Sequence, residues 1–110
     1  MGKFEITKRK NDEFQFSLKA SNGQAILSSE GYTTKAACLN GIESVKKNST
    51  EALRFEELTA KNGKQYFNLK AGNGQIIGTS QMYASEAACK NGIESVMNNA
   101  PQAEIDDQTV

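Results

Sequence analysis

Two stretches of the chain repeat one another: Ala36-Ala37-Cys38-Leu39-Asn40-Gly41-Ile42-Glu43-Ser44-Val45 and Ala87-Ala88-Cys89-Lys90-Asn91-Gly92-Ile93-Glu94-Ser95-Val96. The offset between them is 51 residues, and the same offset relates Leu18-Lys19-Ala20-Ser21-Asn22-Gly23-Gln24 to Leu69-Lys70-Ala71-Gly72-Asn73-Gly74-Gln75. A register held without gaps across a turn and a helix predicts two tandem copies of one β-rich module of roughly 50 residues.

The first part of each copy alternates apolar and polar residues, which predicts strands with one buried face. Phe4 and Ile6 alternate with polar neighbours, and Phe14, Phe16 and Leu18 do the same. We expect strands at residues 3–9, 14–20 and 24–28 in the first copy, and at 54–60, 65–71 and 75–79 in the second.

Three Asn-Gly pairs mark the turns, at residues 22–23, 62–63 and 73–74. Both residue types tolerate positive φ, so each pair predicts a two-residue type I′ hairpin turn. Glu56-Glu57 interrupts the alternation between Phe55 and Leu58, which predicts a β-bulge or a shifted register there.

Each copy then changes to a helical period. Thr34 and Ser85 occupy equivalent positions, and their hydroxyls suit helix N-caps. The helices should run to about residues 47 and 98, with Asn48 and Asn99 as stops, and Pro101 forbids continuation of the second. A last strand is expected at residues 103–106. In the first copy, residues 52–58 should serve as the equivalent strand and should also be the first strand of the second copy.

An apolar stripe on each helix predicts packing against a sheet. Its members are Cys38, Gly41, Ile42 and Val45, and Cys89, Gly92, Ile93 and Val96.

These elements predict an α+β fold. Tandem β-β-β-α-β repeats would form one mainly antiparallel sheet, with two helices packed on one face and pseudo-twofold symmetry. One module is too small to bury its own core. We therefore expect residues 1–110 to form a single compact domain of two repeats, at about residues 2–51 and 52–107.

The chain resembles the YegP-like family of uncharacterised bacterial proteins. The resemblance rests on the Leu-Lys-Ala-x-Asn-Gly-Gln turn, on Tyr32 and Tyr83, and on the Asn-Gly-Ile-Glu-Ser-Val helix ends, in both copies. It covers about residues 2–107. It implies paired units that form one sheet and exchange their C-terminal strands, so that this tandem would be a covalent pseudo-dimer. It implies no established activity.

The composition argues against several classes of protein. Net charge is zero; residues 1–51 carry 8 basic and 6 acidic side chains, and residues 52–110 carry 5 and 7. Neither half has the clustered cations typical of a nucleic-acid surface. The run Lys8-Arg9-Lys10 is interpreted as a solvated turn.

No apolar run approaches the length that a membrane-spanning helix needs, and residues 1–6 lack the features of a signal peptide. We expect a cytoplasmic bacterial monomer with reduced cysteines.

Motifs for catalysis and for cofactors are missing from the sequence. There is no histidine, no Cys-x-x-Cys pair and no phosphate-binding glycine loop. The sequence therefore predicts no catalytic residue, no cofactor and no metal site, although an unusual enzyme using Glu, Lys or Cys stays open. Cys38 and Cys89 are read either as reactive thiols near helix N-termini or as small apolar residues that let helix and sheet approach closely; we favour the second.

Exposed strand edges and the polar face of the helices are the candidate surfaces for contact with a protein or a small ligand. The outer face of the sheet is a further candidate, for weak nucleic-acid binding. The helix face and the sheet face are also typical of ordinary solvated surfaces. The most consistent function is a small non-catalytic binding or protein-interaction module. The candidate residues are Asn40, Glu43, Asn91 and Glu94 on the helices, and Lys19, Lys70 and Tyr66 on the sheet.

Overall fold

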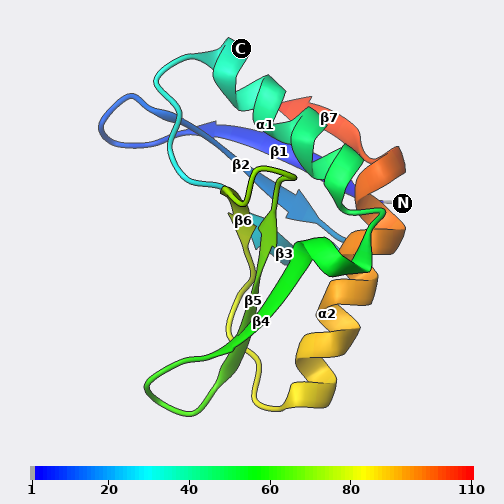
Figure 1. The fold of residues 1–110 in the computed structure, drawn as a ribbon. Helices are drawn as coiled ribbons and strands as arrows, with labels where there is room; N and C mark the ends of the chain where they lie inside the picture. Colours follow the sequence, from blue (N-terminus) through cyan, green and yellow to red (C-terminus); the bar gives the residue numbers. More distant parts are fainter. Residues whose placement is uncertain (1) are drawn as a thin grey trace.

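The computed structural model describes residues 2–110, in which seven strands and two α-helices follow the predicted order (Figure 1). The first copy contains β1 (Lys3–Lys8), β2 (Phe14–Lys19), β3 (Ala25–Ser28) and α1 (Lys35–Asn48). The second contains η1 (Ala52–Arg54), β4 (Phe55–Thr59), β5 (Gln65–Lys70), β6 (Ile76–Thr79), α2 (Glu86–Asn99), η2 (Ala100–Gln102) and β7 (Glu104–Asp107).

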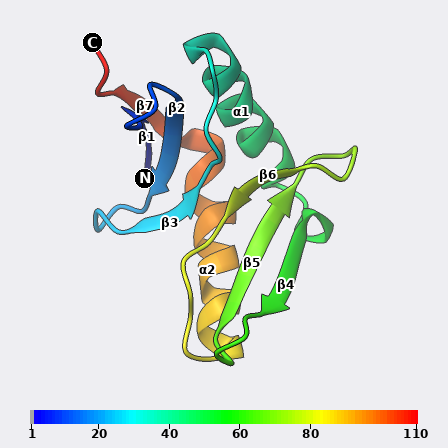
Figure 2. The same ribbon diagram turned by 90° about the vertical axis from the view of Figure 1, so that its left-hand side faces the viewer.

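All seven strands form one twisted sheet in the order β4-β5-β6-β3-β2-β1-β7 (Figure 2). Every pairing is antiparallel except that of β7 with β1, which is parallel. The two copies meet at the centre, where β3 and β6 share the single pair Ser28 and Thr79. The predicted mainly antiparallel sheet is confirmed, and the last strand of the second copy pairs with the first strand of the first copy. The mutual exchange of strands implied by the resemblance is wrong: within the described residues, the segment expected to be the last strand of the first copy pairs, through β4, only with β5 of the second copy.

Both helices pack on the same side of the sheet, as predicted, and the two copies share one core (Figure 1). Ile42 is fully buried, whereas its equivalent Ile93 is only partly buried at the edge of the core. The largest fully buried side chains come from both copies: Phe4, Phe16, Phe67, Ile6, Leu18, Leu27, Ile42, Leu69, Val45 and Val96.

The predicted N-caps are confirmed. The Thr34 hydroxyl oxygen accepts a hydrogen bond from the amide of Ala37 at 3.1 Å, and Ser85 accepts one from Ala88 at 3.1 Å. Each satisfies a donor that has no partner inside the helix. The helices end one residue later than predicted, at Asn48 and Asn99.

The predicted type I′ turns are wrong. Gly23, Gly63 and Gly74 have positive φ, but the asparagine before each does not. The loop is one residue longer than predicted, since the amide of Gly23 donates to the carbonyl of Ala20 and the amide of Ala20 donates to the carbonyl of Gln24. This is a type I turn followed by one left-handed residue. Asparagine is favoured because its side chain accepts from the amide two residues ahead, as Asn22 does from Gln24 at 3.0 Å.

The bulge predicted at Glu56-Glu57 is also wrong, because β4 pairs with β5 in continuous register from Phe55 to Thr59. Register shifts lie instead between Leu18 and Lys19 and between Leu69 and Lys70. Residues 52–54, predicted as part of a strand, form the short 3-10 helix η1. Within residues 2–110, neither α-helix has the length and hydrophobicity that crossing a membrane requires.

Candidate binding surface

The outer face of the sheet holds two ion pairs related by the 51-residue offset. Lys19 Nζ lies 3.1 Å from Glu5 Oε1, and Lys70 Nζ lies 3.1 Å from Glu56 Oε1. The charge of each predicted lysine is therefore balanced by a neighbouring carboxylate. Tyr66 lies in β5 opposite Leu58 of β4 and supplies this part of the face with one partly buried ring. The pairing of both lysines weakens the case for a positive track that would bind nucleic acid.

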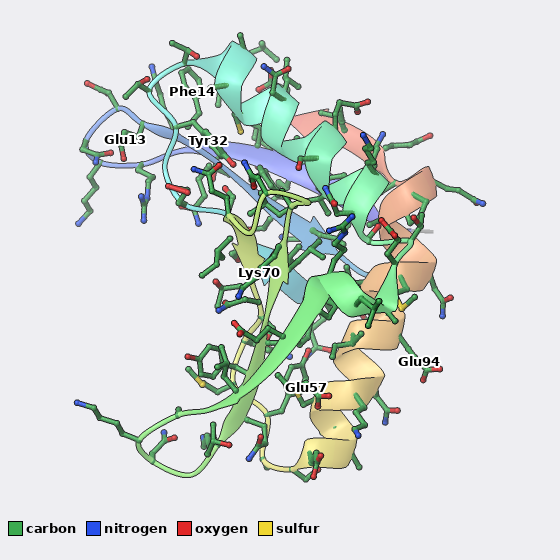
Figure 3. All side chains as sticks on the ribbon, viewed as in Figure 1. Glu13, Phe14, Tyr32, Glu57, Lys70 and Glu94 are labelled. Carbon is green, nitrogen blue, oxygen red and sulfur yellow. The ribbon has the colours of Figure 1, made fainter. Side chains whose placement is uncertain are left out.

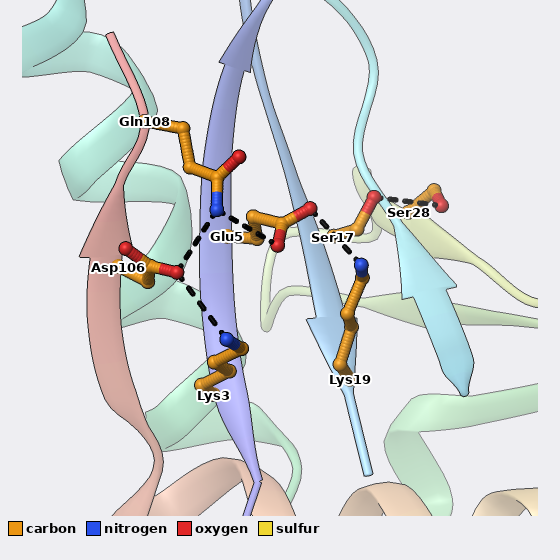
Figure 4. Close-up of polar contacts among 7 residues, drawn as sticks. All are labelled: Lys3, Glu5, Ser17, Lys19, Ser28, Asp106 and Gln108. Atoms are coloured by element: carbon orange, nitrogen blue, oxygen red, sulfur yellow. Dashed lines mark hydrogen bonds and ion pairs between the residues drawn. The ribbon is translucent and has the colours of Figure 1, made fainter. Parts of the chain in front are cut away.

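In the first copy this face continues across β7 as a polar network (Figure 4). The side-chain amide of Gln108 donates to Glu5 at 3.2 Å and to Asp106 at 3.1 Å, and Lys3 Nζ lies 3.3 Å from Asp106. Hydrogen bonds with Gln108 and Lys3 lower the pKa of the Asp106 carboxyl. The network links β7 to β1 on the outer face of the sheet.

A shallow hollow of about 490 Å³ lies where β3 meets β6, over the pseudo-twofold centre. Its lining mixes hydroxyls with aliphatic side chains, including those of Ser28, Ser80, Thr79 and Ile76. The groups whose pKa values the structure perturbs lie elsewhere; they are Tyr32, Tyr83, Cys38, Cys89, Asp106 and Asp107. The hollow therefore presents polar contacts rather than an activated acid or base.

The candidate residues on the polar faces of the two helices lie in two separate parts of the surface. Asn40 and Glu43 line a hollow of about 510 Å³ between α1, η1 and the β5–β6 turn, with Glu43 3.9 Å from Lys46. Asn91 and Glu94 lie exposed on α2 outside that hollow, and Glu94 points away from the molecule (Figure 3). The Asn and Glu side chains of α1 and those of α2 therefore do not form one common site.

Both cysteines are free and fully buried. Burial raises the pKa of each thiol; Asp107 raises that of Cys38 further, and Glu57 and Glu86 raise that of Cys89. These directions oppose the formation of a thiolate and favour the packing role. The close approach itself comes from the glycines, since a Cβ on Gly41 would lie 2.5 Å from the Tyr32 hydroxyl.

A third surface, the outer edge of β4, distinguishes the two copies. The offset of 51 makes β4 the equivalent of β1, because Phe55 corresponds to Phe4 and Glu57 to Ile6. β7 covers the edge of β1, but within residues 2–110 no strand pairs with the outer side of β4. Next to this edge Leu53 is 99% exposed, the largest exposed fraction among the large apolar side chains of the described chain.

The side chains beside the open edge also differ from those beside β7. Glu57 replaces the buried Ile6 and projects from β4 toward α2 (Figure 3). Glu86, in the first turn of α2, replaces Lys35 of α1. Neither glutamate is among the predicted site residues. The offset of 51 pairs Glu57 with Ile6, but only the strand order shows that this carboxylate lies on an edge strand.

The fold defines a class: a tandem β-β-β-α-β protein in which two copies complete one sheet. The chain belongs to the family described as a domain of unknown function, DUF1508, whose model matches residues 10–56 and 60–107. It is 59% identical over 104 residues to a UPF0339 protein in the ptx operon 5′ region of Stutzerimonas stutzeri, covering 94% of each chain. It is 50% identical over 108 residues to YegP of Escherichia coli K12, covering 98% of each.

Two solved structures have the same fold. The solution NMR structure of a UPF0339 protein from Shewanella oneidensis has a TM-score of 0.91 at 57% identity, covering 96% of this chain and 90% of that one. The solution NMR structure of yegP from E. coli, titled a protein of unknown function, has a TM-score of 0.92 at 50% identity, covering 97% and 92%. The predicted family and the α+β fold class are confirmed, and the names of these relatives state no activity.

Proposed function

We propose that this protein is a small non-catalytic interaction module of the bacterial cytoplasm, a monomer that binds an extended segment of a partner protein at the open edge of β4. The observation that carries the proposal is the difference between two equivalent strands: β1 has a parallel partner and β4 has none. An open strand edge offers a row of backbone donors and acceptors, and many interaction domains bind peptides by adding a strand there.

The backbone groups that would bind can be named from the covered edge. The amide of Gln108 donates to the carbonyl of Ile6 at 3.0 Å, so the N–H and C=O of Ile6 face β7. Since β4 pairs with β5 in the register that β1 uses with β2, the equivalent groups of Phe55, Glu57 and Thr59 face the open edge. They would form the ladder with the added segment.

A displayed library of random peptides, selected against the full chain, tests this function. We expect selected peptides to lose binding in Glu57→Pro, which removes an outward N–H, and to retain it in Ile105→Pro, which alters the opposite edge of the sheet. NMR amide shifts should map the bound peptide to Phe55–Thr59. Selection of no peptide, or binding that survives Glu57→Pro, would contradict the proposal.

A further inference from the structure

We propose that the segment added to β4 runs parallel to it and carries an apolar residue followed, two positions later, by a lysine or arginine that faces Glu57 and Glu86. This inference rests on the proposed function, because it specifies the partner of the same edge. β7 covers β1 in the first copy and therefore shows what an occupant of the equivalent edge would contact.

The covered edge supplies the geometry. β7 runs parallel to β1, with Ile105 beside Phe4 and Asp107 beside Ile6. Paired residues in a sheet point to the same face, so Ile105 and Asp107 both lie on the helix side. Asp107 Oδ2 lies 2.7 Å from Lys35 Nζ at the start of α1. A segment on β4 would place its own residues at the two equivalent positions, beside Phe55 and beside Glu57.

The charge at the second position is reversed. Where Asp107 meets Lys35 and the apolar Ile6, the equivalent place on β4 is flanked by Glu86 and Glu57. Lys90 Nζ lies 3.6 Å from Glu86, with both side chains more than half exposed, so one cation stands against two carboxylates. Arg54, also near this edge, is paired with Glu51 at 3.2 Å. A basic side chain is therefore the complementary occupant.

The pKa of the buried Cys89 thiol depends on the same charged groups. Besides burial, Glu57 and Glu86 both raise the pKa of Cys89, and Lys90 lowers it. In the first copy Asp107 raises the pKa of the equivalent thiol, Cys38. Glu57 and Glu86 thus act on the thiol whose equivalent in the other copy is affected by Asp107 of β7.

The apolar position follows from the phenylalanines. Phe4, beside Ile105, is fully buried, whereas its equivalent Phe55 remains partly exposed at the open edge. An apolar residue of the added segment would cover Phe55 as Ile105 covers Phe4. A second copy of this chain would supply Ile105 correctly but would bring Asp107 against Glu57 and Glu86. Like charges disfavour that occupant, which agrees with a monomer that binds a different protein.

Two blocked peptides test the inference directly. One has the sequence of residues 103–109, and the other has the same sequence with Asp107→Lys. Each is titrated into the ¹⁵N-labelled full chain at low salt while amide shifts are followed. We expect the lysine peptide to shift Phe55–Thr59 and to bind roughly two- to fivefold more tightly than the native sequence. In the double variant Glu57→Gln, Glu86→Gln, which keeps the backbone edge, this preference should disappear.

The outcomes separate this inference from the function on which it rests. Equal affinity of the two peptides at β4, or preference for the native sequence, overturns the charge assignment while leaving peptide binding at the edge intact. Shifts confined to β1 and β7 mean that the peptide replaces β7, and they overturn the inference. If neither peptide shifts β4, the inference is wrong; if the displayed library also yields no edge-dependent binder, the proposed function is wrong as well.

Discussion

At the scale of single residues, the clearest difference between the copies is in the first turn of each. Asp12 has a φ of 68°, and its equivalent Gly63 has a φ of 83°. An L-residue is strained in this left-handed region, whereas glycine is not. We expect Asp12→Gly to stabilise the protein by about 0.5–1 kcal/mol and Gly63→Asp to destabilise it by about 1 kcal/mol. Urea unfolding of both variants measures the pair, and equal signs would contradict the turn assignment.

The two cysteines provide a second test at this scale. Both thiols are fully buried, which blocks the access of a reagent, and burial raises their pKa values, which disfavours the thiolate in the native state. We expect Ellman's reagent to react with both thiols only after unfolding in guanidinium. Leu39→Cys, at a position 36% exposed on the same helix, is the control that should react in the native state. Rapid native reaction of the unmodified protein would show that the cysteines have a role beyond packing.

At the scale of elements, each helix is held close to the sheet at one glycine. A Cβ on Gly41 would lie 2.5 Å from the hydroxyl and 2.9 Å from the ring of Tyr32, and Gly92 meets Tyr83 in the same way. Although alanine favours helices by about 1 kcal/mol, overpacking should cost more. We expect Gly41→Ala to destabilise by roughly 1–2 kcal/mol in thermal unfolding. Gly72→Ala, whose Cβ would have its nearest neighbour at 3.5 Å, is a control with little effect.

The docking of β7 should depend on pH. A hydrogen bond with Lys35, followed by those with Thr109, lowers the pKa of Asp107 to about 2 from an ordinary value of 3.8. A carboxyl with a lowered folded-state pKa stabilises the fold above its unfolded pKa. This contribution is therefore complete above about pH 4 and is lost as the pH falls through about 2. We expect the protection of the Gln108 amide, measured against the intrinsic exchange rate at each pH, to decrease over that window. Asp107→Asn should weaken this dependence, and the part that remains should come from Asp106, whose pKa is also lowered.

Most elements could be predicted from the sequence because their patterns are local. The periodicity around Ile42, the caps Thr34 and Ser85, and the alternation around Phe16 each follow from a few neighbouring residues. The turn type was not predictable in this way, because Asn-Gly fits both a two-residue and a three-residue loop, and strand register chooses between them. The exposed position of Glu57 could not be predicted, because it depends on which strand lies at the edge of the sheet, which is a property of the whole topology.

At the scale of the whole molecule, the repeat symmetry is broken at its centre. Leu27 and Gly78 are equivalent residues on β3 and β6, and a Cβ on Gly78 would lie 2.7 Å from the Leu27 side chain. Leu27, 1% exposed, therefore occupies space that its own symmetry mate leaves free. One large and one small residue fill this junction where two large ones would clash, so duplication alone cannot have produced the present packing.

Because Leu27 packs at the junction between the two copies, truncating it should lower the free energy of unfolding of the whole molecule. We expect Leu27→Ala to cost about 2–5 kcal/mol and to leave a single cooperative transition, since both helices share the core that loses the side chain. Gly78→Ala alone should cost roughly 1–3 kcal/mol through overpacking. In the double variant the new methyl group lies in the space that Leu27 vacates, so its loss should be smaller than the sum of the two single losses. Calorimetry with circular dichroism measures all four proteins. Additive losses, or two separate transitions in Leu27→Ala, would mean that the copies are stabilised independently and meet only through the Ser28 and Thr79 pair.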